Sequence, residues 1–111
     1  MRLSAVRQFA MSLPEVTEQP HFHFGSFRVR GRIFVTMPPG DNHIHVFVPE
    51  SNREEGPAVY PEFLEKLFWG SKVVGVKVTL AKAQPAVVKR YIRVAWEAKA
   101  PKALLSQVAK G

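Results

Sequence analysis

The sequence predicts an α+β fold in which an antiparallel β-sheet, built as a meander of hairpins, packs against N- and C-terminal helices. Three runs of alternating apolar and polar residues lie between residues 21 and 48, separated by turn signals at Gly31 and at residues 38–42. Such alternation is typical of strands with one buried face. Apolar residues at helical spacing near both ends of the chain predict the flanking helices.

Length and composition are those of one small domain. The chain has 111 residues, which fits a single domain over 1–111. It has no cysteine, so no disulfide can form, and this suits a reducing cytoplasm. No apolar run approaches the ~18 residues of a membrane span. Arg7 and Gln8 interrupt the apolar stretch that a signal peptide needs. We therefore expect a cytoplasmic monomer that begins with a structural helix.

The first helix is expected to begin at Ser4 and to end before Pro14. The Ser4 hydroxyl can accept a hydrogen bond from a free amide of the first turn, and the residue before a proline avoids the helical conformation. The segment 15–20 is polar and is interpreted as a connection. The apolar residues of the helix are Leu3, Val6, Ala10 and Leu13.

The hairpin around Gly31 determines the register of the meander. A two-residue turn at Arg30 and Gly31 would pair Val29 with Arg32 and place unlike residues on one face. A three-residue loop with Gly31 as a left-handed bulge keeps the apolar residues together, so this register is favoured. It also gathers Arg28, Arg30 and Arg32 at an exposed tip.

The middle of the chain is predicted to hold a strand and two short helices. Residues 43–48 alternate and form the last strand of the meander. Residues 51–54 have the form of a capping box for a short helical turn, which Gly56 and Pro57 close. Pro61 fits the first position of another helix, which ends at Gly70. The apolar side of that helix would contain Phe63, Leu64, Leu67 and Phe68.

A late strand and a long helix complete the fold. Residues 72–80 alternate, with valines inward and Lys77 outward. Gln84 and Pro85 open the longest helix, and residues 103–110 add a final turn or two. The buried stripe of the longest helix is Val88, Tyr91, Ile92 and Ala95. Its solvent-exposed face is Lys89, Arg90, Arg93 and Glu97.

The sequence lacks the motifs of common enzyme classes. It contains no GxSxG, GxxxxGK[ST] or GxGxxG motif, and Asp41 is its sole aspartate. We therefore expect a non-enzymatic protein without a cofactor. The histidines form two H-x-H pairs, each of which could offer two imidazoles to a metal if it lay on a strand. They lack cysteine or carboxylate support, so a polar sheet face explains them better and no metal is expected. The four are His21, His23, His43 and His45.

Basic residues give the strongest functional signal. The 16 lysines and arginines outnumber the 9 acidic residues, for a formal net charge of +7, and a positive field attracts polyanions such as DNA. The candidate phosphate contacts are Arg28, Arg30 and Arg32 on the hairpin, Lys77 on the late strand, and Lys89, Arg90 and Arg93 on the long helix.

Two alternatives are open for these surfaces. Phe24, Phe34 and Phe47 either lie on the second face of the sheet, where they could stack on unpaired bases, or belong to a core covered on both faces. The basic charge could equally be incidental, on a small protein-interaction or ligand-binding module. That alternative predicts an exposed apolar patch or a lined pocket on the second sheet face.

Three motifs resemble the MmcQ/YjbR family of small bacterial proteins. They are SLPEVTE at 12–18, FRVRGRIFV at 27–35 and AWEAKAPKAL at 95–104. The similarity extends from about Leu3 to Leu105. It implies an α+β fold like that of CyaY and frataxin, and DNA binding through a double-wing arrangement of hairpins.

The resemblance assigns the wing to the matched hairpin, which retains Arg28, Arg30 and Arg32. Many members also carry a tryptophan at the start of the late strand. Here that stretch is GSKVVGVKV, and Trp69 lies upstream, at the end of the predicted helix. A role attached to that tryptophan therefore cannot be transferred to this chain.

Overall fold

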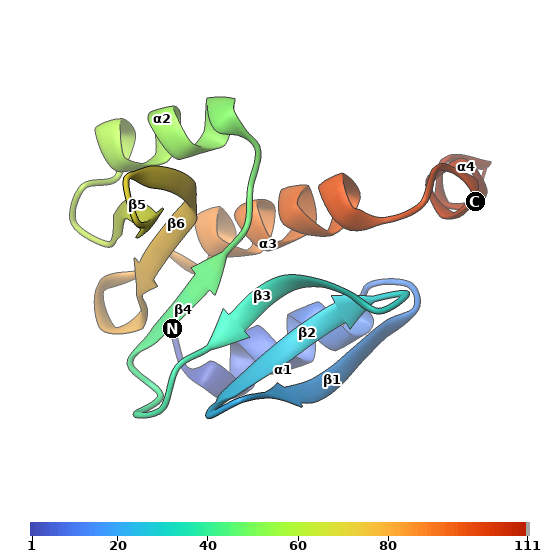
Figure 1. Cartoon of the computed structure of the whole chain (residues 1–111), viewed down its shortest axis with the longest axis horizontal. Coiled ribbons are helices and arrows are strands. Elements are labelled where there is room, and N and C mark those ends of the chain that lie inside the picture. Colours follow the sequence, from blue (N-terminus) through green and yellow to red (C-terminus); the bar gives the residue numbers. More distant parts are fainter. Residues whose placement is uncertain (111) are drawn as a thin grey trace.

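A computed structural model describes residues 1–110 of the chain, and the side chains of residues 1–107. It confirms the α+β architecture, with helices at both ends of the chain and a central sheet (Figure 1). None of the described helices has the length and hydropathy needed to cross a bilayer. The elements are α1 (Leu3–Ser12), β1 (Val16–His21), β2 (Phe24–Val29), β3 (Arg32–Met37), β4 (His43–Val46), α2 (Glu50–Val59), β5 (Leu64–Trp69), β6 (Lys72–Thr79), the 3-10 helix η1 (Leu80–Lys82), α3 (Pro85–Lys99) and α4 (Lys102–Lys110).

The strands form one sheet with the order β1-β2-β3-β4-β6-β5, and all neighbours are antiparallel. β2, β3 and β4 are the predicted meander, and β1 precedes them as an additional edge strand. α2 then carries the chain to the far edge, where β5 begins, and β6 returns between β4 and β5. α1 packs on β1, α3 on β3 and β4, and α2 on β5 and β6 (Figure 1). The core lies between the sheet and these helices.

The helices of the first half differ from the prediction at their boundaries. Ser4 does not cap α1, because the cap position is Arg2 and no side chain caps the helix. α2 lacks the predicted capping box and continues through Pro57. A Cβ at Gly56 would lie 2.9 Å from the Tyr91 hydroxyl oxygen. The tight packing of α2 at Gly56, against Tyr91 of α3 and Leu64 of β5, thus outweighs the local stop signal.

The segment after Pro61, predicted as a helix, is instead strand β5. Leu64 pairs with Val78 of β6, and both side chains are buried. Gly70, predicted to end the helix, has a φ of +62° in the tight turn between β5 and β6. The apolar positions in this segment fit a helix and a strand equally, so the pairing with β6 decides the conformation.

The segment 15–20, interpreted as a polar connection, lies almost entirely in the edge strand β1. This strand pairs with β2 from Val16↔Val29 to His21↔Phe24. Only Val16 is buried, so the strand shows almost no apolar alternation. Pro20 within the strand is typical of an edge, where one row of backbone groups has no neighbouring strand.

The turn between β2 and β3 also differs from the favoured register. Arg30 and Gly31 form a two-residue turn with φ values of +48° and +82°, the left-handed conformation that such turns require. Val29 therefore pairs with Arg32, contrary to the prediction. A bulge at Phe34, further along β3, shifts the register by one residue and returns the apolar side chains to one face.

The late strand and the long helix agree with the prediction. Gln84 occupies the N-cap position of α3 without a side-chain hydrogen bond, and Pro85 is the first residue of the helix. All four residues of the predicted stripe are buried. Trp96 is buried as well, and its Nε1–H donates to the Pro14 carbonyl oxygen at 3.1 Å. This hydrogen bond joins the motifs SLPEVTE and AWEAKAPKAL, which lie far apart in the sequence.

Candidate functional site

A cleft opens where β3 and β6 separate on either side of β4. β4 pairs with β3 only at Val35↔Val46 and Thr36↔His45, and the chain then leaves toward α2. On the other side, β6 comes so close that a Cβ at Gly75 would lie 2.3 Å from the Val46 carbonyl oxygen. Since Val35 and Val46 point into the core, Thr36 and His45 point to the second face of the sheet. The cleft lies on this second face.

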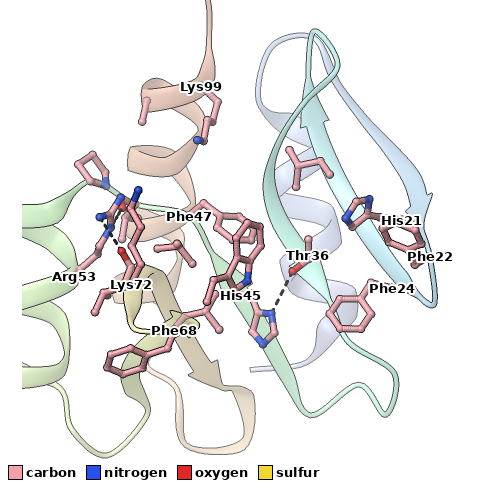
Figure 2. A pocket seen from close by; sticks show the side chains of 18 of the residues that line it. His21, Phe22, Phe24, Thr36, His45, Phe47, Arg53, Phe68, Lys72 and Lys99 are labelled. Carbon is pink, nitrogen blue, oxygen red and sulfur yellow. Dashed lines mark hydrogen bonds between the residues drawn. The ribbon is translucent and has the colours of Figure 1, made fainter.

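This central cleft has a volume of about 680 Å³, within the range of small-molecule sites. Its walls come from the β1–β2 turn, β3, β4, the start of α2, the β5–β6 hairpin and the end of α3 (Figure 2). Among the described residues, no aspartate or glutamate lines it. Its aromatic, histidine and basic lining residues are Phe22, Phe24, Phe47, Phe68, Trp69, His21, His23, His45, Arg53, Lys72 and Lys99.

Aromatic rings dominate the exposed part of the cleft. Trp69 and Phe68 on β5 are 65% and 54% exposed, and Phe22 in the β1–β2 turn is 89% exposed. Trp69 meets Phe47 edge to face, with ring centroids 5.8 Å apart. Large exposed rings gathered around one concavity mark an interaction site, and each ring offers a π-face to a planar group.

His45 lies at the middle of the cleft and remains largely neutral near pH 7. Its Nδ1 lies 3.3 Å from the Thr36 hydroxyl, and its ring centroid lies 6.1 Å from that of Phe24. Burial lowers the pKa of His45, and the nearby Lys77 and His43 lower it further. His45 therefore offers the cleft a neutral ring that can hydrogen-bond and stack.

Three basic side chains line the cleft, and we call them the basic cluster: Arg53, Lys72 and Lys99. Arg53 donates from Nε to the Val48 carbonyl oxygen at 2.7 Å and from Nη1 to the Val73 carbonyl oxygen at 3.1 Å. Among the described residues, none of the three has a carboxylate within 4.0 Å. The cleft is therefore electropositive.

The three predicted hairpin arginines do not form a common exposed tip. Arg28 is half-buried on the second face and donates to groups of β1 and β2. Arg30 forms a two-point ion pair with Glu15, at 2.8 and 2.9 Å, which lowers the pKa of Glu15. Arg32 lies on the helix side and donates to the Lys99 carbonyl oxygen. The two-residue turn causes this separation, because it places Arg28 and Arg32 on opposite faces.

The other predicted contacts lie on different sides of the molecule. Lys77 is on the second sheet face, 3.6 Å from Glu65. Lys89, Arg90 and Arg93 are exposed on α3, which packs on the other face of the sheet. Arg90 and Arg93 each have a glutamate oxygen at 3.8 Å. The seven predicted residues thus do not share one surface.

The histidine pairs are only partly as the sequence implies. His43 and His45 share the second face of β4, whereas His23 lies in the turn after β1, so His21 and His23 lack strand geometry. Across residues 1–110, no three histidine, aspartate or glutamate side chains gather closely enough to hold a metal ion.

Comparison with family models matches residues 11–98 to the YjbR model, which is most of the chain. The chain belongs to the YjbR family. The matched region runs from the end of α1 to the end of α3 and so includes nearly all of the cleft lining. A comparison with curated proteins found no match.

Among solved structures, this YjbR chain is similar to the crystal structure of the Deinococcus radiodurans protein DR2400, a DUF419 domain. The TM-score is 0.76 at 16% sequence identity, and the match covers 97% of this chain and 88% of that chain. At this identity the likeness shows the fold, and it confirms the predicted α+β architecture.

The sequence indicated part of the YjbR cleft and missed the rest. Phe24 and Phe47 lie on the second face, as one alternative held, whereas Phe34 is fully buried. Trp69 was missed because its segment was interpreted as a helix. Arg53 was missed because nothing near it in the sequence distinguishes a cleft arginine from a solvated one on a helix.

Proposed function

We propose that the protein binds single-stranded nucleic acid in the central cleft, with unpaired bases on its aromatic rings and phosphates near its basic side chains. One observation carries this proposal: exposed rings and unpaired cations line the same concave surface on the second sheet face. Proteins that bind single strands combine these two features, because every base has a π-face and every nucleotide has a phosphate.

The geometry favours an unpaired strand over a duplex held by a wing. Arg30, at the tip of the candidate wing, is engaged with Glu15, and Arg32 is directed to the end of α3. A duplex offers only the edges of its bases in its grooves. Rings such as Trp69 and Phe68 gain a stacking partner only from an unpaired base.

Fluorescence anisotropy with labelled single-stranded and duplex DNA of the same sequence tests this proposal. The single strand should bind more tightly, and its affinity should fall steeply with salt because bound phosphates release counterions. Trp69→Ala should weaken binding about 5- to 150-fold, since stacking contributes about 1–3 kcal/mol per base.

The matched control is Lys89→Ala, which removes an exposed charge from α3 on the other side of the sheet. It should change the affinity much less than Trp69→Ala. Absence of single-strand binding at low salt would rule out the proposal. If Lys89→Ala weakened binding more than Trp69→Ala, the binding surface would lie on α3 instead of in the cleft.

A free small molecule is a second candidate ligand, because the cleft is concave and its volume suits a single ring-bearing anion. It would use the same rings and cations. A series of strands of increasing length separates the two. Affinity that rises with length supports a strand, whereas full affinity for one mononucleotide or aromatic acid supports the small ligand.

A further inference from the structure

Arg53 is a half-buried cation whose hydrogen-bonding capacity is only partly used. A guanidinium has five N–H donors, and those of Arg53 make two hydrogen bonds, to the carbonyl oxygens of Val48 and Val73. Among the described residues, the other N–H groups have no protein acceptor. The two carbonyl oxygens hold the planar guanidinium group of Arg53 in place between the segment after β4 and the start of β6.

A purely structural role explains why Arg53 makes these two hydrogen bonds. It does not explain why the positive charge of its guanidinium lacks a compensating negative charge. Neutral carbonyl groups compensate a partly desolvated cation only in part, and proteins normally pair such a charge with an anion. The cleft lining adds Lys72 and Lys99 without adding any carboxylate. A bound anion would balance this charge.

The basic cluster is separated from part of the aromatic lining. Figure 2 shows Arg53, Lys72 and Lys99 on one side of the cleft and His21, Phe22 and Phe24 on the other, with Phe47 and His45 between them. A ligand that carries its negative charge at one end and its ring at the other matches this division.

We infer that Arg53, Lys72 and Lys99 form a subsite for a terminal phosphate, so that the cleft takes the phosphorylated end of a nucleotide strand. A phosphomonoester carries about −1.5 to −2 charges near pH 7, whereas a phosphodiester within a strand carries one. Three cations without acidic partners match the more highly charged group. The fixed guanidinium fork suits two-point binding of phosphate oxygens. This inference rests on the proposed binding of single strands for the identity of its ligand.

The test compares one short single-stranded oligonucleotide with a 5′-phosphate, a 3′-phosphate or no terminal phosphate. The wild-type protein should bind one phosphorylated form about tenfold more tightly than the unphosphorylated form, the effect of one added charged hydrogen bond. Lys72→Ala combined with Lys99→Ala should abolish this preference. Lys72 is exposed and Lys99 is partly exposed, so the double variant should fold. Lys89→Ala is the control that should keep the preference.

Equal binding of all three oligonucleotides by the wild-type protein would overturn the subsite while leaving strand binding intact. Retention of the preference by the double variant would also overturn it. If no oligonucleotide binds, the proposed function fails, and titration with inorganic phosphate followed by NMR decides the subsite alone. Phosphate-dependent shifts at Arg53 that vanish in the double variant would support it, and their absence would refute it.

Discussion

Phe22 has a backbone conformation that a phenylalanine rarely adopts. Its φ is +57° in the β1–β2 turn, and its ring is 89% exposed at the cleft. Left-handed conformations cost an ordinary residue about 1–2 kcal/mol, and most of that cost disappears with glycine. A strained, exposed ring at a cleft is more consistent with ligand contact than with folding.

Phe22→Gly should therefore raise the free energy of unfolding by about 0.5–1 kcal/mol and weaken single-strand binding. Chemical denaturation and anisotropy measure the two effects. Asp41→Gly is the matched control, because Asp41 has a φ of +58° and does not line the cleft. It should stabilise without changing affinity. Unchanged affinity of the Phe22→Gly variant would show that the Phe22 ring is not part of the binding surface.

His45 should make stability depend on pH. Its pKa is lowered in the folded protein by burial and by the nearby Lys77 and His43, so the unfolded chain takes up a proton first as the pH falls below about 6.5. The free energy of unfolding should decrease from there down to the folded pKa and then level off. His45→Gln, which can still hydrogen-bond to Thr36, should show a smaller decrease between pH 7.5 and 5. Equal slopes for the two proteins would contradict this.

Trp96 connects the two ends of the family motif pattern. Its indole N–H donates to the Pro14 carbonyl oxygen, and its ring is 1% exposed. Trp96→Phe should lower the free energy of unfolding by about 1–3 kcal/mol, because it removes the donor to the Pro14 carbonyl oxygen and leaves a small void in the core. Urea denaturation measures this change. An unchanged free energy of unfolding in Trp96→Phe would show that the hydrogen bond contributes little to stability.

At the scale of elements, the close contact between β4 and β6 shapes the cleft. A Cβ at Gly75 would lie 2.3 Å from the Val46 carbonyl oxygen, a backbone atom that cannot rotate away. Gly75→Ala should therefore destabilise the protein by several kcal/mol, as overpacking against backbone does at its upper end. At Gly25 the nearest atom is the flexible Cε of Met37, at 2.8 Å. Gly25→Ala should be milder, and thermal melting of both variants checks the order.

Some elements could be predicted because their residue pattern fits only a strand or only a helix. β4 alternates strictly, and β2, β3 and β6 are short runs rich in β-branched and aromatic residues between turn signals. α3 has a continuous buried stripe opened by Pro85. β5 was not predictable, because its apolar residues satisfy both periods and only β6 selects the strand. The β2–β3 register was not predictable either, because the bulge at Phe34 lies beyond the turn that local sequence specifies.

At the scale of the whole molecule, a net charge of +7 does not mark one binding surface. The basic residues predicted from sequence spread over the second sheet face, the hairpin and α3, and four of them lie within 4.0 Å of a carboxylate. The number of basic residues can be read from the sequence, but the fold determines which of them lie next to an acidic side chain. The basic cluster depends on where β4 leaves the sheet and where α3 ends, which no local pattern encodes.

The most direct test of the central claim is NMR mapping of a single-stranded oligonucleotide on the ¹⁵N-labelled protein. Stacking in the central cleft predicts the largest shifts at Trp69, Phe47 and His45, including the Trp69 indole N–H, and none beyond salt effects at Lys89 and Arg93. Shifts concentrated on α3 or on the Arg30 turn, with the cleft unchanged, would contradict the account.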